Sequence, residues 1–301
     1  MRIPDESLRE IDERGYTIVE GVLDDDEVAA ARNGIWDHHP RPDDYFADPA
    51  AYPHLAENGF AGIDRGFPFA SWDLTRLCVH PDLLDGVERY LGTDDISLYK
   101  VELWAKYAGA TDYEQAHHRD YANHTLVVPR ADGYARQVTT FTLLSDVTEA
   151  DAPTKIVPLE HSANLPLVLD RQHLNERFTV LSKGELFDVE VPVVGPAGSV
   201  LLYRTDVFHR ASGFTEPGRS RFTLLLDFQG RTPDGGPSWT GKVAWPNHAT
   251  SRPWQEFLAR LSVRERDLFG FPKPGDPYWN EQTLRDVGAR YPGMDMAPYR
   301  V

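Results

Sequence analysis

The chain has 301 residues, with 47 acidic against 31 basic side chains and a net charge of −16 at pH 7. Its apolar fraction of 41% is enough to bury a sizeable core. The single cysteine excludes a disulfide scaffold, an iron–sulfur cluster and a cysteine-based zinc site. The acidic balance argues against nucleic acid and anionic membranes as partners. No apolar run is long enough for a membrane span, and the N-terminus lacks a secretory signal. We therefore expect a soluble, cytoplasmic, globular protein.

The first ninety residues favour helices with one short strand among them. Helices are predicted at about 7–14 and 81–91, and a strand at 16–19. Between them, Asp24 and Glu27 have the spacing of a capping box, which predicts the start of another helix.

From residue 96 the pattern changes to short β-rich runs separated by turns. Strands are predicted at 96–107, 125–128, 137–147, 155–157, 189–194, 199–203 and 222–228. Many short strands at this spacing are typical of a sandwich or barrel and not of a parallel βαβ sheet. We expect one mainly β domain over 1–301, with a β core at about 96–230 and a partly helical C-terminal extension at 231–301.

The strongest chemical signal is the pair His118 and Asp120. On a strand, residues i and i+2 project to the same face, so both side chains can reach one metal ion. His209, on a distant strand, would supply a third ligand. Two histidines and one carboxylate on one face leave the opposite positions open, which suits non-haem Fe(II) that must bind a cosubstrate and O₂. A second H-x-D triplet begins at His80, but Pro81 within it marks a helix start.

Further features occur in a recognisable order around these ligands. Segments 15–28 (GYTIVEGVLDDDEV) and 146–162 (DVTEADAPTKIVPLEHS) stand before His209, and Arg219 and Arg221 lie ten and twelve residues after it. In these motifs the chain resembles the phytanoyl-CoA dioxygenase (PhyH-like) family of Fe(II)- and 2-oxoglutarate-dependent oxygenases. The resemblance runs from the N-terminal motif to about residue 228.

The resemblance implies a double-stranded β-helix (jelly roll, cupin-like) with flanking N-terminal and C-terminal helices. It also implies that His118, Asp120 and His209 bind Fe(II). Arg221 would pair with the distal carboxylate of 2-oxoglutarate, because R-F-T-L-L-L begins a strand as the family's arginine does, and Arg219 is the alternative.

Side chains on the predicted strands are candidates for the rest of the site. Thr140 and Thr142 share one barrel face, and we expect them to contact the 2-oxoglutarate carboxylates. Trp104, Tyr107 and Tyr113 precede the metal ligands and would form either an apolar wall of the site or part of the barrel core.

The activity that the resemblance implies is hydroxylation of an unactivated C–H bond in a small organic substrate, with release of succinate and CO₂. Two alternatives stay open: a cupin-like metal enzyme that uses no 2-oxoglutarate, and a non-catalytic binding barrel. The substrate is expected to contact loop 40–70, segment 163–187 and the C-terminal extension. None of these segments contains a motif that identifies a substrate. Segment 163–187 is also predicted to cover the iron site. Neither the substrate nor the oligomeric state can be predicted.

Overall fold

The computed structural model divides the chain into two compact units. The residues that it describes are 2–67, 69–94, 96–120, 136–163, 165, 185–230, 271–276 and 293–300, with individual positions between 259 and 291. The first unit comprises Met1–Tyr90, Val101–Arg119 and Val138–Asp227, and the second comprises Leu91–Lys100, Asp120–Gln137 and Phe228–Val301. The single domain expected over 1–301 stays a prediction.

The helices of the N-terminal part begin and end where local chemistry requires it. The described helices are α1 (Asp5–Arg14), α2 (Asp25–Ile35), α3 (Pro42–Ala47), α4 (Trp72–Thr75) and α5 (Pro81–Leu91), with 3₁₀ turns η1 (Pro49–Ala51), η2 (Pro53–Ala56), η3 (Arg76–Val79), η4 (Leu159–His161) and η6 (Ala297–Tyr299). Helix α1 ends at Gly15, whose φ of 88° is a left-handed conformation that glycine adopts without strain. Helix α2 begins at the predicted capping box of Asp24 and Glu27, in which both reciprocal hydrogen bonds form.

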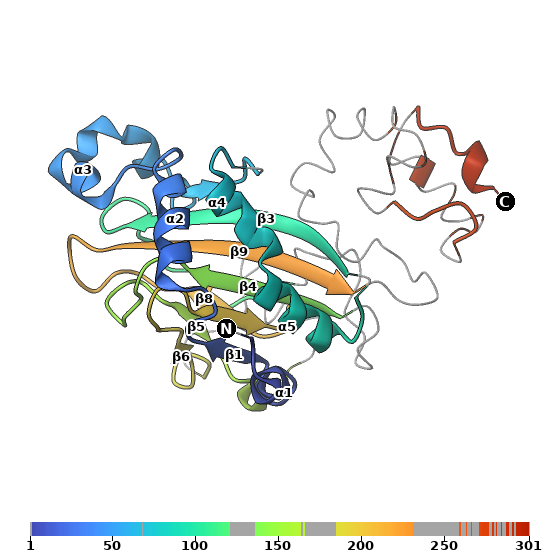
Figure 1. Cartoon of the computed structure of the whole chain (residues 1–301), viewed down its shortest axis with the longest axis horizontal. Helices are drawn as coiled ribbons and strands as arrows, with labels where there is room; N and C mark the ends of the chain where they lie inside the picture. Colours follow the sequence, from blue (N-terminus) through green and yellow to red (C-terminus); the bar gives the residue numbers. More distant parts are fainter. Residues whose placement is uncertain are drawn as a thin grey trace. The chain divides into compact units, whose positions relative to one another are not determined.

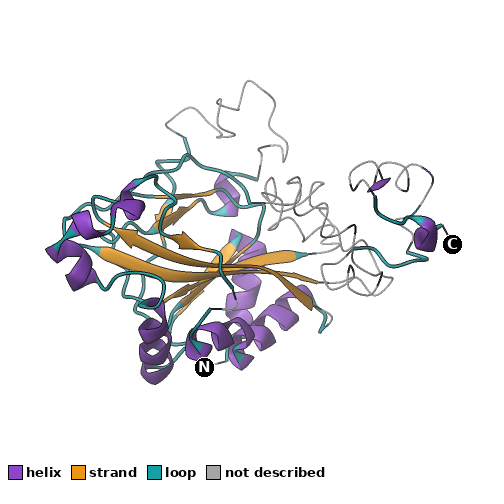
Figure 2. Ribbon diagram, turned by 90° about the horizontal axis from the view of Figure 1, so that it is seen from above, coloured by secondary structure: helices purple, strands orange, loops and turns teal. Residues whose placement is uncertain are grey.

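The strands form two antiparallel sheets, which confirms the predicted mainly β architecture. They are β1 (Tyr16–Val19), β2 (Ile63–Asp64), β3 (Ile96–Tyr107), β4 (Gln137–Leu143), β5 (Thr154–Ile156), β6 (Val191–Pro192), β7 (Val200–Tyr203), β8 (His209–Ala211) and β9 (Ser220–Gly230). The larger sheet has the order β1-β7-β4-β9-β3-β2 and the smaller one β6-β5-β8. Figure 1 shows α2 and α5 crossing one face of the larger sheet, and in Figure 2 helices pack along one side of the strand layer.

The core lies between the two sheets. It joins Phe141 of β4, Tyr203 of β7 and Leu225 of β9 in the larger sheet to Ile156 of β5 in the smaller one. We call the side of the larger sheet that faces this core the inner face. Partnered residues of antiparallel strands share a face, so the pairing of Thr139 with Tyr203 also puts Thr139 on the inner face.

Strand β9 is buried on both sides, and its two faces differ in chemistry. Phe222 contacts Trp36 at the end of α2, with ring centroids 5.2 Å apart, so the even-numbered residues face the helices. They are Phe222, Leu224, Leu226 and Phe228, all apolar and buried. The inner face carries Arg221, Thr223, Leu225 and Asp227, and three of these four buried residues are polar or charged. Such a face suits a site and not a closed core.

Some sequence-based expectations fall outside the described residues. These are the strand at 125–128, most of segment 163–187 and much of the extension 231–301. Within the extension, Ala259, Val263 and Arg266 are helical, and a small apolar cluster centres on Tyr291 and Met294. None of the described helices is long and apolar enough to cross a bilayer.

Candidate metal centre

A backbone bridge between two segments far apart in sequence holds His118 and His209 together. The amide of His118 donates to the carbonyl of His209 at 2.9 Å, and the amide of His209 donates back at 3.0 Å. The two residues therefore form a directly opposed antiparallel pair with side chains on the same face. Their imidazole centroids lie 4.4 Å apart.

The same local contact orients both imidazoles. Nδ1 of His118 lies 3.1 Å from the carbonyl oxygen of Ala116, and Nδ1 of His209 lies 3.2 Å from that of Val207. A carbonyl oxygen can only accept, so each Nδ1 must carry the proton. The lone pair of each ring is then on Nε2, which is the tautomer that a metal ligand requires.

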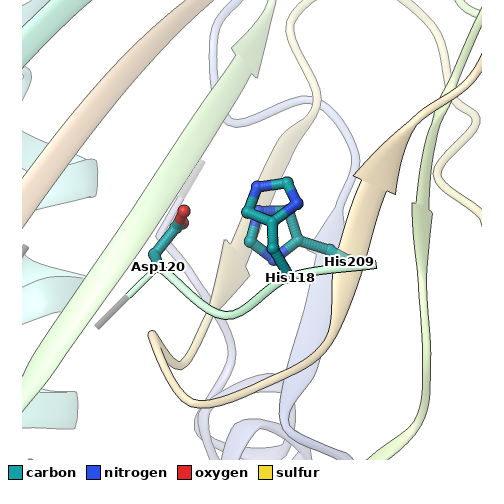
Figure 3. Close-up of side chains that lie close together, drawn as sticks. All are labelled: His118, Asp120 and His209. Atoms are coloured by element: carbon teal, nitrogen blue, oxygen red, sulfur yellow. The ribbon is translucent and has the colours of Figure 1, made fainter. Parts of the chain in front are cut away.

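Asp120 completes the group. One ligand atom from each of His118, Asp120 and His209 lies within 4.8 Å of the other two. Figure 3 shows the carboxylate of Asp120 directed toward the two rings. Among the described residues this is the one group of three or more such ligands that could hold a metal ion. Two imidazoles and a carboxylate on one side fit Fe(II) and leave coordination positions for a cosubstrate.

A group of aromatic side chains lies beside His209. The ring of Tyr203 lies 4.9 Å from that of His209 and stacks on Phe141, and Trp104 packs edge-on against Phe141 at 6.0 Å. Trp104 therefore lies on the inner face, packed against the core cluster that contains Phe141 and Tyr203. Tyr107 instead packs against Tyr45 of α3 at 4.5 Å and donates its hydroxyl to the carbonyl of Pro40.

The two candidate arginines have different surroundings. Arg221 is buried, its Nη1 donates to the carbonyl of Ala152, and its Nε has no hydrogen-bond partner among the described residues. Burial lowers the pKa of Arg221 to about 10. Arg219 is 41% exposed, and its guanidinium pairs with Glu216 and lies 3.5 Å from Asp151. The unsatisfied Nε makes Arg221 the arginine that suits a carboxylate ligand.

Thr140 and Thr142 lie on the face of β4 that points away from the core. In the register with β7 they pair with Leu202 and Val200, whereas Phe141 between them lies on the inner face. The hydroxyl of Thr140 donates to the carbonyl of Leu226 at 3.3 Å. The structure therefore does not bring these threonines together with the triad. Their contact with 2-oxoglutarate stays a prediction.

Two side chains that sequence reasoning did not assign to the cosubstrate lie near Arg221: Lys106 is buried, and Tyr113 is partly exposed but has a buried hydroxyl. Nζ of Lys106, at the end of β3, donates to the carbonyls of Ser212 at 2.7 Å and Tyr113 at 3.3 Å. It also lies 4.5 Å from the centre of the Tyr113 ring. The available signal was strand alternation, because Lys106 is two residues from Trp104 and shares its face.

A buried carboxylate joins the two ligand segments on the side away from the metal. His117 and Arg210 are opposed because His118 and His209 are paired, and both contact Glu190. Arg210 donates Nε at 2.7 Å and Nη2 at 2.6 Å, and Nε2 of His117 lies 2.8 Å from Oε2. Burial lowers the pKa of His117, although Glu190 opposes this shift. We call these three residues the Glu190 clamp.

The fold and the site define a class of metal-dependent oxygenase built on antiparallel sheets. The phytanoyl-CoA dioxygenase (PhyH) family model matches residues 11–222, more than half of the chain. The chain therefore belongs to the PhyH family of Fe(II)- and 2-oxoglutarate-dependent oxygenases, as its motifs predicted, with the double-stranded β-helix fold and the iron and 2-oxoglutarate cofactors of that family.

Solved structures with the same fold are distant in sequence. The non-heme alpha ketoglutarate dependent epimerase SnoN from nogalamycin biosynthesis is 21% identical, with a TM-score of 0.55 over 76% of this chain and 81% of that one. Iron-bound HygX from Streptomyces hygroscopicus is 19% identical, with a TM-score of 0.53 over 78% and 94%. EctD from S. alaskensis, with 2-oxoglutarate and 5-hydroxyectoine, is 18% identical, with a TM-score of 0.53 over 80% and 84%. At these identities the likeness shows the fold alone. No curated protein gives a significant match.

Proposed function

We propose that the protein hydroxylates an unactivated C–H bond of a small organic molecule and converts 2-oxoglutarate to succinate and CO₂. The observation that carries the proposal is the ligand group: His118, Asp120 and His209 present their ligand atoms within 4.8 Å of one another. With the proton of both histidines on Nδ1 and the lone pair on Nε2, the group is ready to bind Fe(II) through one face.

In this proposal each part of the chain has a defined task. The triad holds the iron, and Arg221 binds the distal carboxylate of 2-oxoglutarate and so orients its keto acid end toward the metal. Together, iron and 2-oxoglutarate supply the oxidising chemistry that uses O₂. Tyr203, Phe141 and Trp104 exclude water on one side of His209, which protects a reactive centre from side reactions.

The first test is replacement of the carboxylate ligand. Asp120→Ala should lose iron binding and all substrate-stimulated succinate production while the protein still folds, because a ligand in an open site contributes little to core packing. Iron content after anaerobic loading and succinate release during a screen of small molecules give the two measurements. Asp43→Ala removes an exposed aspartate of α3 and is the matched control. Full iron affinity and turnover in Asp120→Ala would contradict the ligand assignment.

The second candidate reaction is epimerisation, because SnoN, which shares the fold, is an epimerase. Heavy-isotope O₂ separates the two. Hydroxylation places an oxygen atom from O₂ in the product, and epimerisation leaves the composition of the substrate unchanged. If the metal binds but neither reaction consumes 2-oxoglutarate with any substrate, the cupin-like alternative is favoured. If no metal binds, the non-catalytic barrel is favoured.

A further inference from the structure

Glu102 is a buried carboxylate on the inner face of β3, and both of its oxygens have partners. It shares that face with Trp104, two residues further along the strand, and only 5% of its side chain is exposed. Oε1 accepts a hydrogen bond from Nε of Arg65 at 2.7 Å, and Oε2 accepts one from Nε1 of Trp104 at 3.0 Å. Replacement of such a buried ion pair by apolar side chains is often neutral, so stability alone does not account for it. What the pair does accomplish is to fix the direction of the Arg65 guanidinium.

The guanidinium of Arg65 has an unused end. Arg65 directly follows β2, and the register of that strand with β3 sets it opposite Glu102 on the inner face. Its side chain is 48% exposed, and apart from the bond of Nε it donates to no described residue. With Nε held by a carboxylate, the two Nη groups form a fixed fork that can bind an oxyanion through two parallel hydrogen bonds.

A row of aromatic rings on the inner face runs from Arg65 to the metal centre. Next to Arg65, Trp104 packs edge-on against Phe141 at 6.0 Å. Phe141 in turn stacks on Tyr203, whose ring lies 4.9 Å from that of His209. Strand β2 is the edge strand of the larger sheet, so Arg65 lies at the end of this row away from the metal ligands. A molecule that binds Arg65 and extends along the row therefore points toward the triad.

Exposed aromatic surface lies close to the fork. Phe60 is 47% exposed, and its ring lies 4.8 Å from that of Tyr113. Arg65 acts electrostatically on Tyr113, as does the buried Arg221, so this pair of rings is near both arginines. A half-exposed fork beside aromatic surface suits a ligand that carries an oxyanion on a flat apolar body.

We propose that Arg65 binds an oxyanion of the primary substrate, a carboxylate or a phosphate, and that Glu102 is the positioning residue for its guanidinium. In the proposed function Arg221 holds the cosubstrate, and Arg65 is then a separate anchor for the molecule that is oxidised. This inference rests on the proposed function, because it names the substrate class of the same iron site. An anchor remote from the iron fixes one end of the substrate and so selects which C–H bond is presented to the metal.

Fluorine NMR titration of anaerobic protein, loaded with Fe(II) and saturated with 2-oxoglutarate, tests the anchor without turnover. The probes are 4-fluorobenzoate, 4-fluorophenyl phosphate and the neutral 4-fluorobenzamide, which share a flat apolar ring. Wild type should bind both anions more tightly than the amide. Arg65→Gln should weaken binding of the anions by about five- to thirtyfold, the range for charge-assisted hydrogen bonds at a half-exposed site, and leave the amide unchanged.

Further variants separate anchoring from folding and from net charge. Arg76→Gln removes an arginine of similar exposure that pairs with Asp73, and it should change nothing. Arg65→Lys keeps the charge without the fork and should retain only part of the affinity for the anions. Glu102→Gln removes a negative charge beside Arg65, so a purely electrostatic effect would tighten anion binding. Loss of positioning should instead weaken it by about three- to tenfold.

Each outcome decides between these roles. Equal binding of the anions and the amide by wild type, no binding of any probe, or unchanged anion affinity in Arg65→Gln overturns the anchor and leaves the proposed function intact. Tighter anion binding by Glu102→Gln overturns the positioning role. If that variant does not fold, Glu102→Asp, which keeps the charge and shortens the reach, applies the same comparison and should also weaken anion binding. Failure of wild type to bind 2-oxoglutarate would overturn the proposed function itself. A preference between the two anions distinguishes a carboxylate substrate from a phosphate one.

Discussion

Each metal-binding histidine is oriented by its own segment of backbone. His118 donates to the carbonyl of residue 116 and His209 to that of residue 207, so both use the carbonyl two positions earlier. The orientation of the imidazole thus needs no distant partner, and the backbone bridge then has only to bring the two segments together. A ligand set of this kind is largely formed before the metal arrives, which lowers the entropic cost of binding it.

The arginine assignment can be tested one residue at a time. Arg221→Ala should weaken 2-oxoglutarate binding by about 2–3 kcal/mol, because a buried bidentate partner of a carboxylate is lost. Arg219→Ala is the matched control and should have little effect, since its guanidinium is 41% exposed and already paired with Glu216. Calorimetry on the iron-loaded protein measures both. A larger effect from Arg219 would move the role to that residue.

The sequence was sufficient to select the triad and insufficient for the residues around it. H-x-D spacing puts His118 and Asp120 on one face wherever the strand lies, so that inference did not depend on tertiary structure. Alternation also groups Thr140 with Thr142, but it cannot say which face meets the helices. Phe222 against Trp36 settles that point, and it is a contact between residues far apart in sequence. Lys106 was not assigned to the site from the sequence either, because alternation alone does not say which face of β3 points inward.

At the scale of elements, the Glu190 clamp links the neighbours of two metal ligands. Glu190→Ala should lower the free energy of unfolding by about 3–5 kcal/mol, because the buried guanidinium of Arg210 loses the carboxylate to which it donates two hydrogen bonds and keeps only the exposed Glu114 at 3.8 Å. Chemical denaturation measures the change. Glu160→Ala is the matched control: Glu160 is exposed and lies 3.4 Å from His161, so its loss should cost under about 0.5 kcal/mol. Equal losses in the two variants would remove the special role of the clamp.

Elements with a local signal were predicted well. The helix after Asp24 begins at the capping box that the sequence showed, and six of the seven predicted β-rich runs coincide with strands of the two sheets. The seventh, 125–128, lies outside the described residues. Strand β2 (Ile63–Asp64) was missed because it lies in a proline-rich stretch and consists of two residues. Its formation depends on pairing with Leu103 and Trp104, a non-local contact that no window of sequence contains.

At the scale of the whole molecule, His39 should make stability sensitive to acid. It is buried, neither ring nitrogen has a partner among the described residues, and burial lowers its pKa to about 4. In the unfolded chain His39 takes up a proton near pH 6.5, whereas in the folded chain it does so only near pH 4. The contribution of neutral His39 to the free energy of unfolding is therefore fully present above about pH 6.5 and decreases as the pH falls toward about 4.

His39→Phe isolates this effect. Between about pH 7.5 and about pH 5, wild type should lose roughly 2 kcal/mol of unfolding free energy through protonation of His39. Over the same pH range His39→Phe should lose about 2 kcal/mol less than wild type. Denaturant titrations at both pH values give the comparison. His161→Phe replaces a more exposed histidine and should leave the pH dependence of wild type unchanged. The same slope in wild type and His39→Phe would show that another group controls acid sensitivity.

The two-faced chemistry of strand β9 has a consequence for how this protein can acquire new activities. Phe222, Leu224 and Leu226 lie on the face toward the helices. Arg221, Thr223 and Asp227 lie on the inner face. Exchange of Thr223 alters what the interior offers to a ligand and leaves the apolar interface with the helices untouched. Substrate preference and scaffold integrity can therefore change independently along a single strand, and a mutant library confined to inner-face positions should retain far more folded members than a random one of equal size.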